Sequence, residues 1–381
     1  MQIDFHYYAT YAAAYIAGYS PKEAVDIAYS AFAVDVCSAQ LLTKLGAPIV
    51  AATTQLQMEL MEHHTDIVGL QNITRIWSSF HFLPRDLKAE YNGKCTKKYL
   101  RKYRLICGPN GELVRDTIEN AKGSTLQAIG IAMHVLADTW AHMYFAGTPS
   151  LVINNTDKHL FELFPDGSEK RIAFKHNPVA ADKPDEGAYT ASIYQSNENN
   201  IMNLGHGRIG HLPDYGYCVY KYLPAWNDYK EVIKDNPSDY NKAFRQMVYA
   251  LQYIRGDRDT FSLDTYAEEE VAPYADEIDK VIRTRKILIC DEWKAFGEKL
   301  TNETIEDFDI KKYQSEYMDT SDKSNTFLGK FFDASIRHKS MVTNRIYKSG
   351  SKLAGISIEQ DRTKATLEMV KNTLKVGDDN V

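Results

Sequence analysis

Long stretches of small and apolar residues, interrupted by single polar side chains, predict that this chain is mainly helical. The clearest stretch starts at Pro21, where Ser20 is a suitable N-cap and Glu23, three residues later, completes a capping box. We expect one mostly buried helix over residues 21–45. The same reasoning predicts further helices at 53–66 and within 119–145. Helices with so few charges normally pack inside a bundle.

The pattern changes after residue 150, where short segments indicate strands. The segments HLFELF and RIAFKH flank Pro165-Asp166-Gly167-Ser168, which has the residues of a tight turn. We therefore predict a small β-hairpin insertion near 151–177. Residues 178–217 are rich in Asn, Gly, Pro and Tyr, and we expect them to form a long ordered loop of the kind that is usually functional. Charged amphipathic helices are predicted at 240–255, 275–298, 325–348 and 358–375.

Together these elements predict a mainly α fold, a multi-helix bundle with a small β-hairpin insertion and a helical C-terminal extension. The predicted domains are a helical core at 1–225 and a helical accessory region at 226–381. The accessory region contains only His338 of the 11 histidines, next to Arg337 and Lys339. We expect it to supply no metal ligand.

Composition narrows the possible functions. The 381 residues are 44% hydrophobic and 25% charged, as in a folded soluble protein with a real core. A net charge of -6 without any block of five or six like charges argues against stable nucleic-acid binding and against a membrane-surface role. No apolar run approaches the ~18 residues of a membrane span, and the N-terminus lacks the basic region of a signal peptide. The five cysteines show no C-x-x-C pairing, so we expect reduced thiols and a cytoplasmic location.

The strongest chemical signal is the segment HVLADTWAH, which places His134, Asp138 and His142 at positions i, i+4 and i+8 of an apolar helix. At 100° per residue these three side chains form one stripe. Burying two imidazoles and a carboxylate without partners is costly. The stripe therefore predicts a metal site, and the alternative is a hydrogen-bonded polar seam.

Two further acids stand near the N-terminus. Asp4 and His6 lie two residues apart before a helix of small residues, where the histidine is either a ligand or part of an aromatic surface. Asp35 lies in the apolar sequence AVDVC, where a carboxylate needs a metal, an arginine or a helix cap as its partner. Both acids are candidates for the same site.

The segment 205–214, GHGRIGHLPD, also contains candidate ligands. Its G-x-G-x-x-G spelling is not a dinucleotide motif, because Pro213 and the residues after it make a following helix improbable. It offers His206, His211 and Asp214 to a metal, with His211 and Asp214 as the preferred pair.

Other histidines compete for a place in the cluster. His81, between aromatic residues in FHFLP, is preferred over the doublet His63-His64, which ends a polar segment. We expect the three remaining histidines to lie on the surface: His159, His176 and His338.

Absent motifs also discriminate between chemistries. The chain has no H-E-x-x-H, no helical E-x-x-H pair, no Walker loop and no G-x-S-x-G. A mixture of Asp and His without cysteine suits zinc, with manganese or iron as alternatives, in a hydrolytic role.

Several of these segments carry a resemblance: DFHYYATYAAAYIAGYS, AVDVCS, FHFLP, HVLADTWAH and GHLPDY. Together they resemble an uncharacterised bacterial family of unknown function. More distantly, the order of histidines and acids over residues 1–217 is similar to that of the zinc-dependent phospholipase C and single-strand-specific nuclease superfamily. That resemblance implies an all-helical fold and a trinuclear zinc cluster that hydrolyses phosphodiesters.

The resemblance also implies a role for each candidate. His6 matches the early histidine, Asp35 the carboxylate on the next helix, and His81 or His64 the histidine that follows. His134 and Asp138 match the H-x-x-x-D pair, in which the aspartate bridges two ions. The ligands of the remaining ion would be His142, His211 and Asp214. Two intervals, Asp138 to His142 and His211 to Asp214, are shorter than in that superfamily, so the expected number of ions runs from one to three.

One ligand position of that superfamily is filled by the first residue of the mature chain. Here we expect no cleavage, we expect Gln2 to protect Met1 from removal, and we expect Asp4 to take this ligand position.

The sequence therefore predicts a metal-dependent hydrolase whose substrate is a small-molecule, lipid or nucleotide phosphoester, with Asp138 and Asp35 at the reaction centre. Two other classes stay open. One is a binding or scaffold protein with a structural metal site, and the other is a metal-free helical module. The oligomeric state is open as well.

Overall fold

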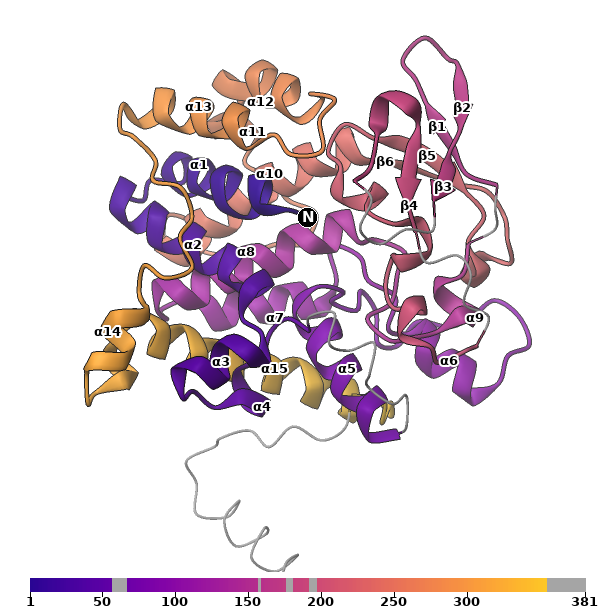
Figure 1. Ribbon diagram of the computed structural model, residues 1–381, viewed down its shortest axis with the longest axis horizontal. Helices are drawn as coiled ribbons and strands as arrows, with labels where there is room; N and C mark the ends of the chain where they lie inside the picture. Colours follow the sequence, from indigo (N-terminus) through magenta and orange to yellow (C-terminus); the bar gives the residue numbers. More distant parts are fainter. Residues whose placement is uncertain (57–66, 157–158, 176–180, 192–196, 355–381) are drawn as a thin grey trace, which may run out of the picture.

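The computed structural model describes residues 1–56, 67–156, 159–175, 181–191 and 197–354, and within them the protein is mainly helical with a small sheet region at one end (Figure 1). The first helices are η1 (Asp4–Ala9), α1 (Thr10–Ile16), α2 (Pro21–Val36), α3 (Ala39–Leu45), α4 (Ile49–Ala52), α5 (Ile67–Phe80), α6 (Lys97–Tyr103), α7 (Glu112–Ala121), α8 (Leu126–Ala141) and α9 (Leu151–Asn154). The strands are β1 (Phe161–Leu163), β2 (Glu169–Arg171), β3 (Ala173–Lys175), β4 (Ala188–Thr190), β5 (Val219–Tyr222) and β6 (Val232–Asp235). The later helices are α10 (Asn236–Arg255), α11 (Glu268–Val271), α12 (Ala275–Ile282), α13 (Cys290–Thr301), α14 (Gln314–Asp319) and α15 (Phe327–Lys348).

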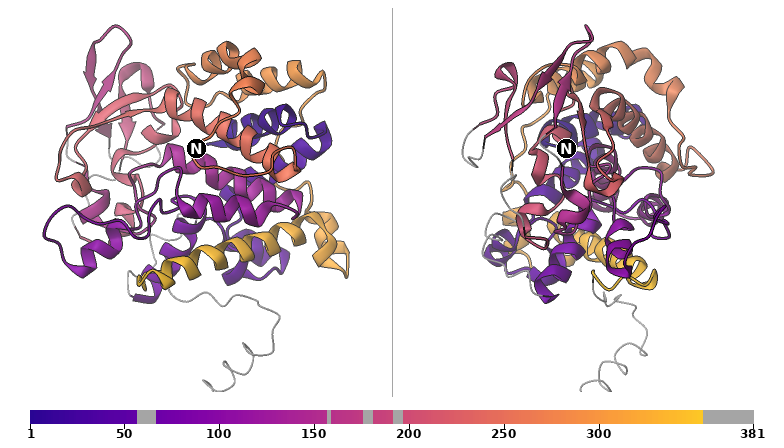
Figure 2. Two further views of the ribbon diagram at one scale, coloured as in Figure 1. Left: turned by 180° about the vertical axis from the view of Figure 1, so that it is seen from behind. Right: turned by 90° about the vertical axis from the view of Figure 1, so that its right-hand side faces the viewer.

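Helix α8 is the centre of the bundle. Its N-cap is Thr125, whose side chain accepts a hydrogen bond from Ala128 N, and every residue from Ile129 to Ala141 is buried. Helices α2, α7, α10 and α15 pack around it, and the long helix α15 runs along one side of the bundle (Figure 2). The polar side chains of this stretch are therefore buried in the interior of the bundle.

The crossing of α2 and α8 is unusually close. A Cβ atom at Gly130 would lie 2.3 Å from the carbonyl oxygen of Ile27, so only glycine allows the two backbones to approach. This contact brings Asp35, near the end of α2, toward the polar stripe of α8.

The predicted helix at 21–45 is confirmed at its start and wrong in its length. Ser20 and Glu23 form the expected capping box. Helix α2 ends at Val36, and α3 starts after Ser38 with a bend of 112°. The reason is local, because the Ser38 side chain accepts a hydrogen bond from Leu41 N and so starts a new helix.

Other predicted boundaries also shift. The helix predicted at 53–66 is wrong for residues 53–56, which are not helical. Residues 57–66, with the doublet His63-His64, lie outside the described residues. The interval between 275 and 298 contains two helices, α12 and α13. The helix predicted at 358–375 lies outside the described residues, as does His176.

The predicted hairpin is confirmed, but the sheet is larger than the hairpin. Strands β1 and β2 pair antiparallel around the 165–168 turn. They continue into a four-stranded antiparallel sheet in the order β2-β1-β5-β6, and β3 and β4 form a parallel pair. The predicted domain boundary at residue 225 thus falls between two paired strands, β5 and β6.

The helices after residue 235 pack on the same core as the N-terminal helices. Phe5 in η1 contacts both Tyr240 of α10 and Trp293 of α13 edge to face, with ring centroids 5.0 and 5.9 Å apart. Tyr29 of α2 makes a similar contact with Phe327 of α15. One continuous hydrophobic cluster joins residues from Met1 to Ala354.

Of the described helices, none is at once long and apolar enough to cross a membrane by itself, and one bent pair, α2 with α3, meets that test only when its two helices are combined.

His338 is buried, which corrects the expectation of a surface histidine. Its Nε2–H donates to the carbonyl oxygen of Ser79 over 2.7 Å, and its ring lies against Phe80. His159 is exposed, as expected. The basic neighbours of His338 suggested a surface position, but only Arg337 is exposed. Lys339 is buried like His338, and its Nζ donates to the carbonyl oxygen of Thr53 over 2.9 Å.

Burial of His338 predicts an acid-sensitive contribution to stability. Burial lowers its pKa from 6.5 to about 4. Below pH 6.5 the unfolded chain binds a proton that folded His338 does not accept, so the free energy of unfolding falls as the pH drops toward 4. We expect H338Q to flatten this dependence by about 1.4 kcal/mol per pH unit in that window. Urea unfolding of both proteins at pH 7, 6 and 5 measures it, and parallel curves would contradict the assignment.

Candidate metal centre

Asp138 lies at the centre of a buried cluster of imidazoles and carboxylates. Its Oδ1 is 3.0 Å from His6 Nε2, and its Oδ2 is 3.2 Å from His134 Nε2 and 3.5 Å from His142 Nδ1. His81 Nδ1 approaches the same Oδ2 at 3.4 Å. The structure thus brings together the three residues of the predicted stripe and adds two histidines from η1 and from the residue after α5.

Ligand-type atoms gather into three groups, and within each group they all lie within 4.8 Å of one another. The groups are His6, His134 and Asp138; Asp35, His81 and His134; and His142, His206 and Asp214. The first two share His134. These residues come from η1, α2, α8 and three loops, so the whole helical core positions them.

Several histidines direct one ring nitrogen away from the cluster. His81 Nε2 is 3.0 Å from the Thr54 carbonyl oxygen, His142 Nδ1 is 2.6 Å from the His81 carbonyl oxygen, and His206 Nδ1 is 2.6 Å from the Gly210 carbonyl oxygen. A carbonyl oxygen only accepts, so each of these nitrogens carries the hydrogen. In the neutral ring the other nitrogen then has a free lone pair that faces the cluster, which is the usual orientation of a metal-binding histidine.

Three of the histidines are held in the neutral form that binds metals. Burial lowers the pKa values of His6, His134 and His206 to about 4. The rings of His6 and His134 stack with centroids 3.8 Å apart, and charging both would add repulsion. At neutral pH these three imidazoles are therefore available as ligands.

Two carboxylates stay ionised although they are buried. Burial acts to raise the pKa of Asp138, but the charges of His142 and of the Met1 amino group hold it well below 3.8. The Asp214 pKa is also held well below 3.8, because the Met1 amino group and His206 outweigh burial. Burial raises the pKa of Asp35. The cluster therefore contains negative charge that attracts a cation.

The amino group of Met1 lies inside this cluster. It is 2.7 Å from Asp138 Oδ1, 3.2 Å from Asp214 Oδ1 and 3.1 Å from His142 Nε2. Burial lowers its pKa, but the charges of Asp138 and Asp214 raise it to about 11. Figures 1 and 2 show the N-terminus in the middle of the molecule in every view.

The position of Asp4 corrects the expectation that it replaces the chain terminus as a ligand. Asp4 Oδ2 accepts a hydrogen bond from Ile289 N over 3.1 Å, and Oδ1 accepts one from Phe5 N. Asp4 belongs to none of the three groups. The turn η1 is π-helical, a conformation that is rare and often functional. It directs Met1 and His6 toward the cluster, whereas Asp4 binds the backbone of Ile289, just before α13.

The loop at 205–214 brings His206 and Asp214 into the cluster, instead of the predicted pair His211 and Asp214. His206, with 14% of its side chain exposed, joins His142 and Asp214 in the third group. His211 is 59% exposed and reaches Asp214 Oδ2 with its Nδ1 at 3.0 Å. His211 thus lies at the edge of the cluster, whereas His206 lies within it. The Nδ1–H group of His206 donates to the Gly210 carbonyl oxygen and so orients the His206 ring. This contact depends on the loop conformation, and no sequence pattern predicts it.

The polar atoms of this site fit a metal ion. Asp138 Oδ2, His6 Nδ1 and His134 Nδ1 are buried and have no hydrogen-bond partner among the described residues. Leaving such atoms unpaired in a protein interior is costly. A divalent ion would satisfy Asp138 Oδ2, which His134 faces with its Nε2 rather than with its unpaired Nδ1. The donor set of imidazoles and carboxylates suits zinc, manganese or iron.

One edge of the cluster is open to solvent. The Asp35 side chain is 20% exposed and His211 is more than half exposed, whereas His6 and His134 are fully enclosed. Structural zinc sites are usually closed, while catalytic sites keep one position open.

A comparison with known protein families gives one match, and it spans the whole cluster. Residues 1–346 match the model of a family of unknown function, DUF6765. Neither a curated protein nor a solved structure matches the chain.

Proposed function

The chain belongs to the DUF6765 family of unknown function, and from the geometry of its own site we propose that it is a metal-dependent hydrolase of a phosphoester, with a phosphodiester as the expected substrate. The observation that carries the proposal is the set of three adjoining ligand groups around Asp138. The order of these ligands along the chain, and its similarity to the zinc-dependent phospholipase C and nuclease superfamily, support the choice of phosphodiester.

In this proposal each group of residues has a separate task. Asp138 belongs to the first group, and its Oδ2 is also 3.5 Å from His142 Nδ1 of the third, so it could bridge two ions. His142, His206 and Asp214 would hold a further ion. A divalent ion bound here would polarise a phosphoryl oxygen and lower the pKa of a water molecule.

The chain's own groups also determine how a substrate meets this centre. Asp35 lies at the open edge, where its carboxylate can accept a proton from an attacking water. The Met1 amino group, between Asp138 and Asp214, could serve as a further metal ligand in its neutral form, its proton being released to solvent when a metal binds.

The partial exposure of the cluster favours a catalytic site over a structural metal site. A purely structural ion needs no partly exposed carboxylate such as Asp35. A metal-free polar seam would not leave Asp138 Oδ2 without a donor. Each of these two alternatives predicts a result that differs from that of the proposal in the experiment described next.

The experiment is elemental analysis and a turnover assay on the same preparation. The full chain is purified without chelator, with any tag at the C-terminal end because Met1 is buried. We expect at least one equivalent of zinc, manganese or iron, and hydrolysis of bis(p-nitrophenyl) phosphate that EDTA abolishes.

The other outcomes separate the alternatives. Bound metal without turnover of phosphodiesters or phosphomonoesters would indicate a structural metal site. Less than about a tenth of an equivalent of metal, with no response to added metal, would leave the hydrogen-bonded seam.

A further inference from the structure

Residues 94–104 form a basic segment of the chain. Residues 94–104, KCTKKYLRKYR, carry six basic side chains and no acidic one, in a chain whose net charge is -6. The six are interspersed with other residues, so they do not form a contiguous block. Of them only Lys102 forms an ion pair with a described residue, Glu198. The segment forms α6 and the loop before it.

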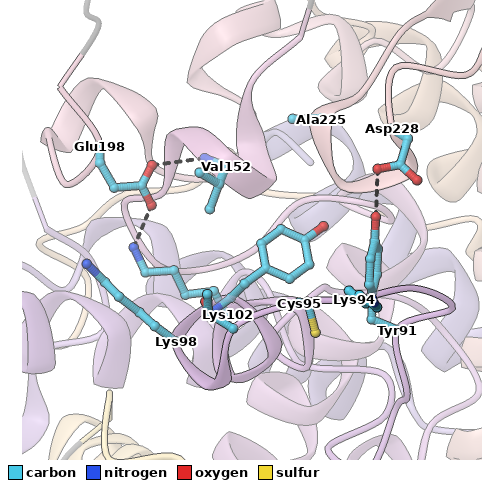
Figure 3. Close-up of a pocket in the computed structure, with 11 residues that line it drawn as sticks. Tyr91, Lys94, Cys95, Lys98, Lys102, Val152, Glu198, Ala225 and Asp228 are labelled. Atoms are coloured by element: carbon cyan, nitrogen blue, oxygen red, sulfur yellow. Dashed lines mark hydrogen bonds and ion pairs between the residues drawn. The ribbon is translucent and has the colours of Figure 1, made fainter.

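A pocket opens against this segment. Its volume is about 380 Å³, and it lies between the 91–102 segment, α9 and the turn η7 (Ala225–Asn227). Figure 3 shows Lys98 and Lys102 on one side, Tyr91 and Asp228 on the other, and Val152 and Ala225 above them. Pockets of this size hold small organic ligands.

The pocket has an apolar wall. Val152 is 43% exposed although it is apolar, and Ala225 lies beside it in the lining. Tyr91 and Tyr99 meet edge to face, with ring centroids 5.0 Å apart. An exposed valine across from tyrosine rings is a surface that a flat, apolar ring system can cover.

The charged groups of the pocket leave a positive end. Glu198 accepts hydrogen bonds from Lys102 Nζ at 2.7 Å, from Ser150 Oγ and from Val152 N at 3.0 Å. Its negative charge is therefore compensated by groups of the protein itself. Burial lowers the pKa of Lys102, and the nearby charge of Lys98 acts in the same direction. Lys94 and Lys98 are exposed and form no ion pair with the described residues. Their ammonium groups are available to a phosphate.

The opposite end of the pocket offers an acceptor. The Tyr91 hydroxyl donates to Asp228 Oδ1 over 2.6 Å. The second carboxylate oxygen of Asp228 can accept a hydrogen bond from an N–H group of a ligand. A ligand that fits this pocket therefore has a flat ring, an N–H donor and an anionic group.

We propose that this pocket binds a nucleoside monophosphate, with its base between Tyr99 and Val152, its N–H edge toward Asp228 and its phosphate on Lys94 and Lys98. The pocket shares no residue with the three ligand groups around Asp138. The proposal therefore does not depend on the metal-dependent hydrolysis.

Calorimetric titration of the full chain with AMP, adenosine and inorganic phosphate at low ionic strength tests this site. AMP should bind at least about tenfold tighter than adenosine or phosphate, because only AMP uses both the apolar wall and the lysines. K98Q should weaken AMP binding at least about fivefold, while K97Q, on the adjacent residue that does not line the pocket, should change it less than about twofold. V152E should abolish binding, and I233E, at an exposed apolar residue outside the pocket, should not.

Four results would overturn the proposal. They are the absence of AMP binding at millimolar concentration, equal affinities of the K97Q and K98Q proteins, and phosphate binding as tight as AMP binding, which would indicate a plain anion surface. The fourth is loss of AMP binding in D138N together with its retention in V152E, which would place the nucleotide at the metal centre. Binding to vesicles that contain phosphatidic acid, without binding to AMP, falls under the first of these.

Discussion

Replacing Asp138 by asparagine is expected to remove bound metal and phosphodiesterase activity together. Asparagine keeps the shape of the side chain, but it loses the charge and one of the two acceptor oxygens, of which Oδ1 lies beside His6 and Met1 and Oδ2 beside His134. Partners that only orient ligands are worth 10–100-fold in metal affinity, so loss of a central ligand should weaken binding by more than about 100-fold. Elemental analysis and turnover of bis(p-nitrophenyl) phosphate measure both effects on one sample.

The control for this variant is D26N, on α2. Asp26 is half-buried and accepts a hydrogen bond from the Tyr313 hydroxyl over 2.8 Å, away from the cluster. If Asp138 were only a structural partner, D138N would lower the free energy of unfolding by about 1–3 kcal/mol and leave the metal in place. Full metal occupancy in D138N would therefore refute the bridging role.

Extending the chain by Gly-Ser before Met1 is expected to disrupt the same metal centre by removing a different group, the free amino group. The Met1 amino group is fully enclosed and contacts Asp138 and Asp214. An extension turns this amine into an amide, which neither binds a metal well nor carries a charge, and it places two residues next to a position that is fully enclosed. Removing one partner of a buried ion pair typically costs about 3–5 kcal/mol, so the extended chain should melt at a markedly lower temperature and bind less metal.

The matched control is the same dipeptide added at the C-terminal end. Metal content and melting temperature of the two extended proteins are compared with those of the unextended chain. Equal metal content and equal melting temperature in all three would show that the Met1 amino group is not part of the site. A drop in melting temperature with full metal content would limit its role to the ion pair.

The local features of this protein follow from the sequence by itself. The capping box of Ser20 and Glu23, the turn at 165–168 and the mainly helical fold depend on residues close together in the chain, whose preferences act over a few positions. The stripe of His134 and Asp138 belongs here too, because helical periodicity alone places residues four apart on one face.

The tertiary structure decided which of several similar candidates meet. His206 and His211 look alike in the sequence, but the loop conformation buries the first and leaves the second largely exposed. Asp4 is two residues from His6, yet the π-helical turn directs it to Ile289. His338 has basic neighbours, yet its place on the inner face of α15 buries it.

The entry of Met1 into the cluster is the clearest case of this kind. No pattern of polar and apolar residues marks an amino group, and the distance from Met1 to Asp138 is 137 residues in sequence but 2.7 Å in space. The same holds for the packing of α10, α13 and α15 on the N-terminal helices, which joined the two predicted regions into one core. Periodicity determines which face of a helix is apolar, whereas only the packing of all helices together determines which other face covers it.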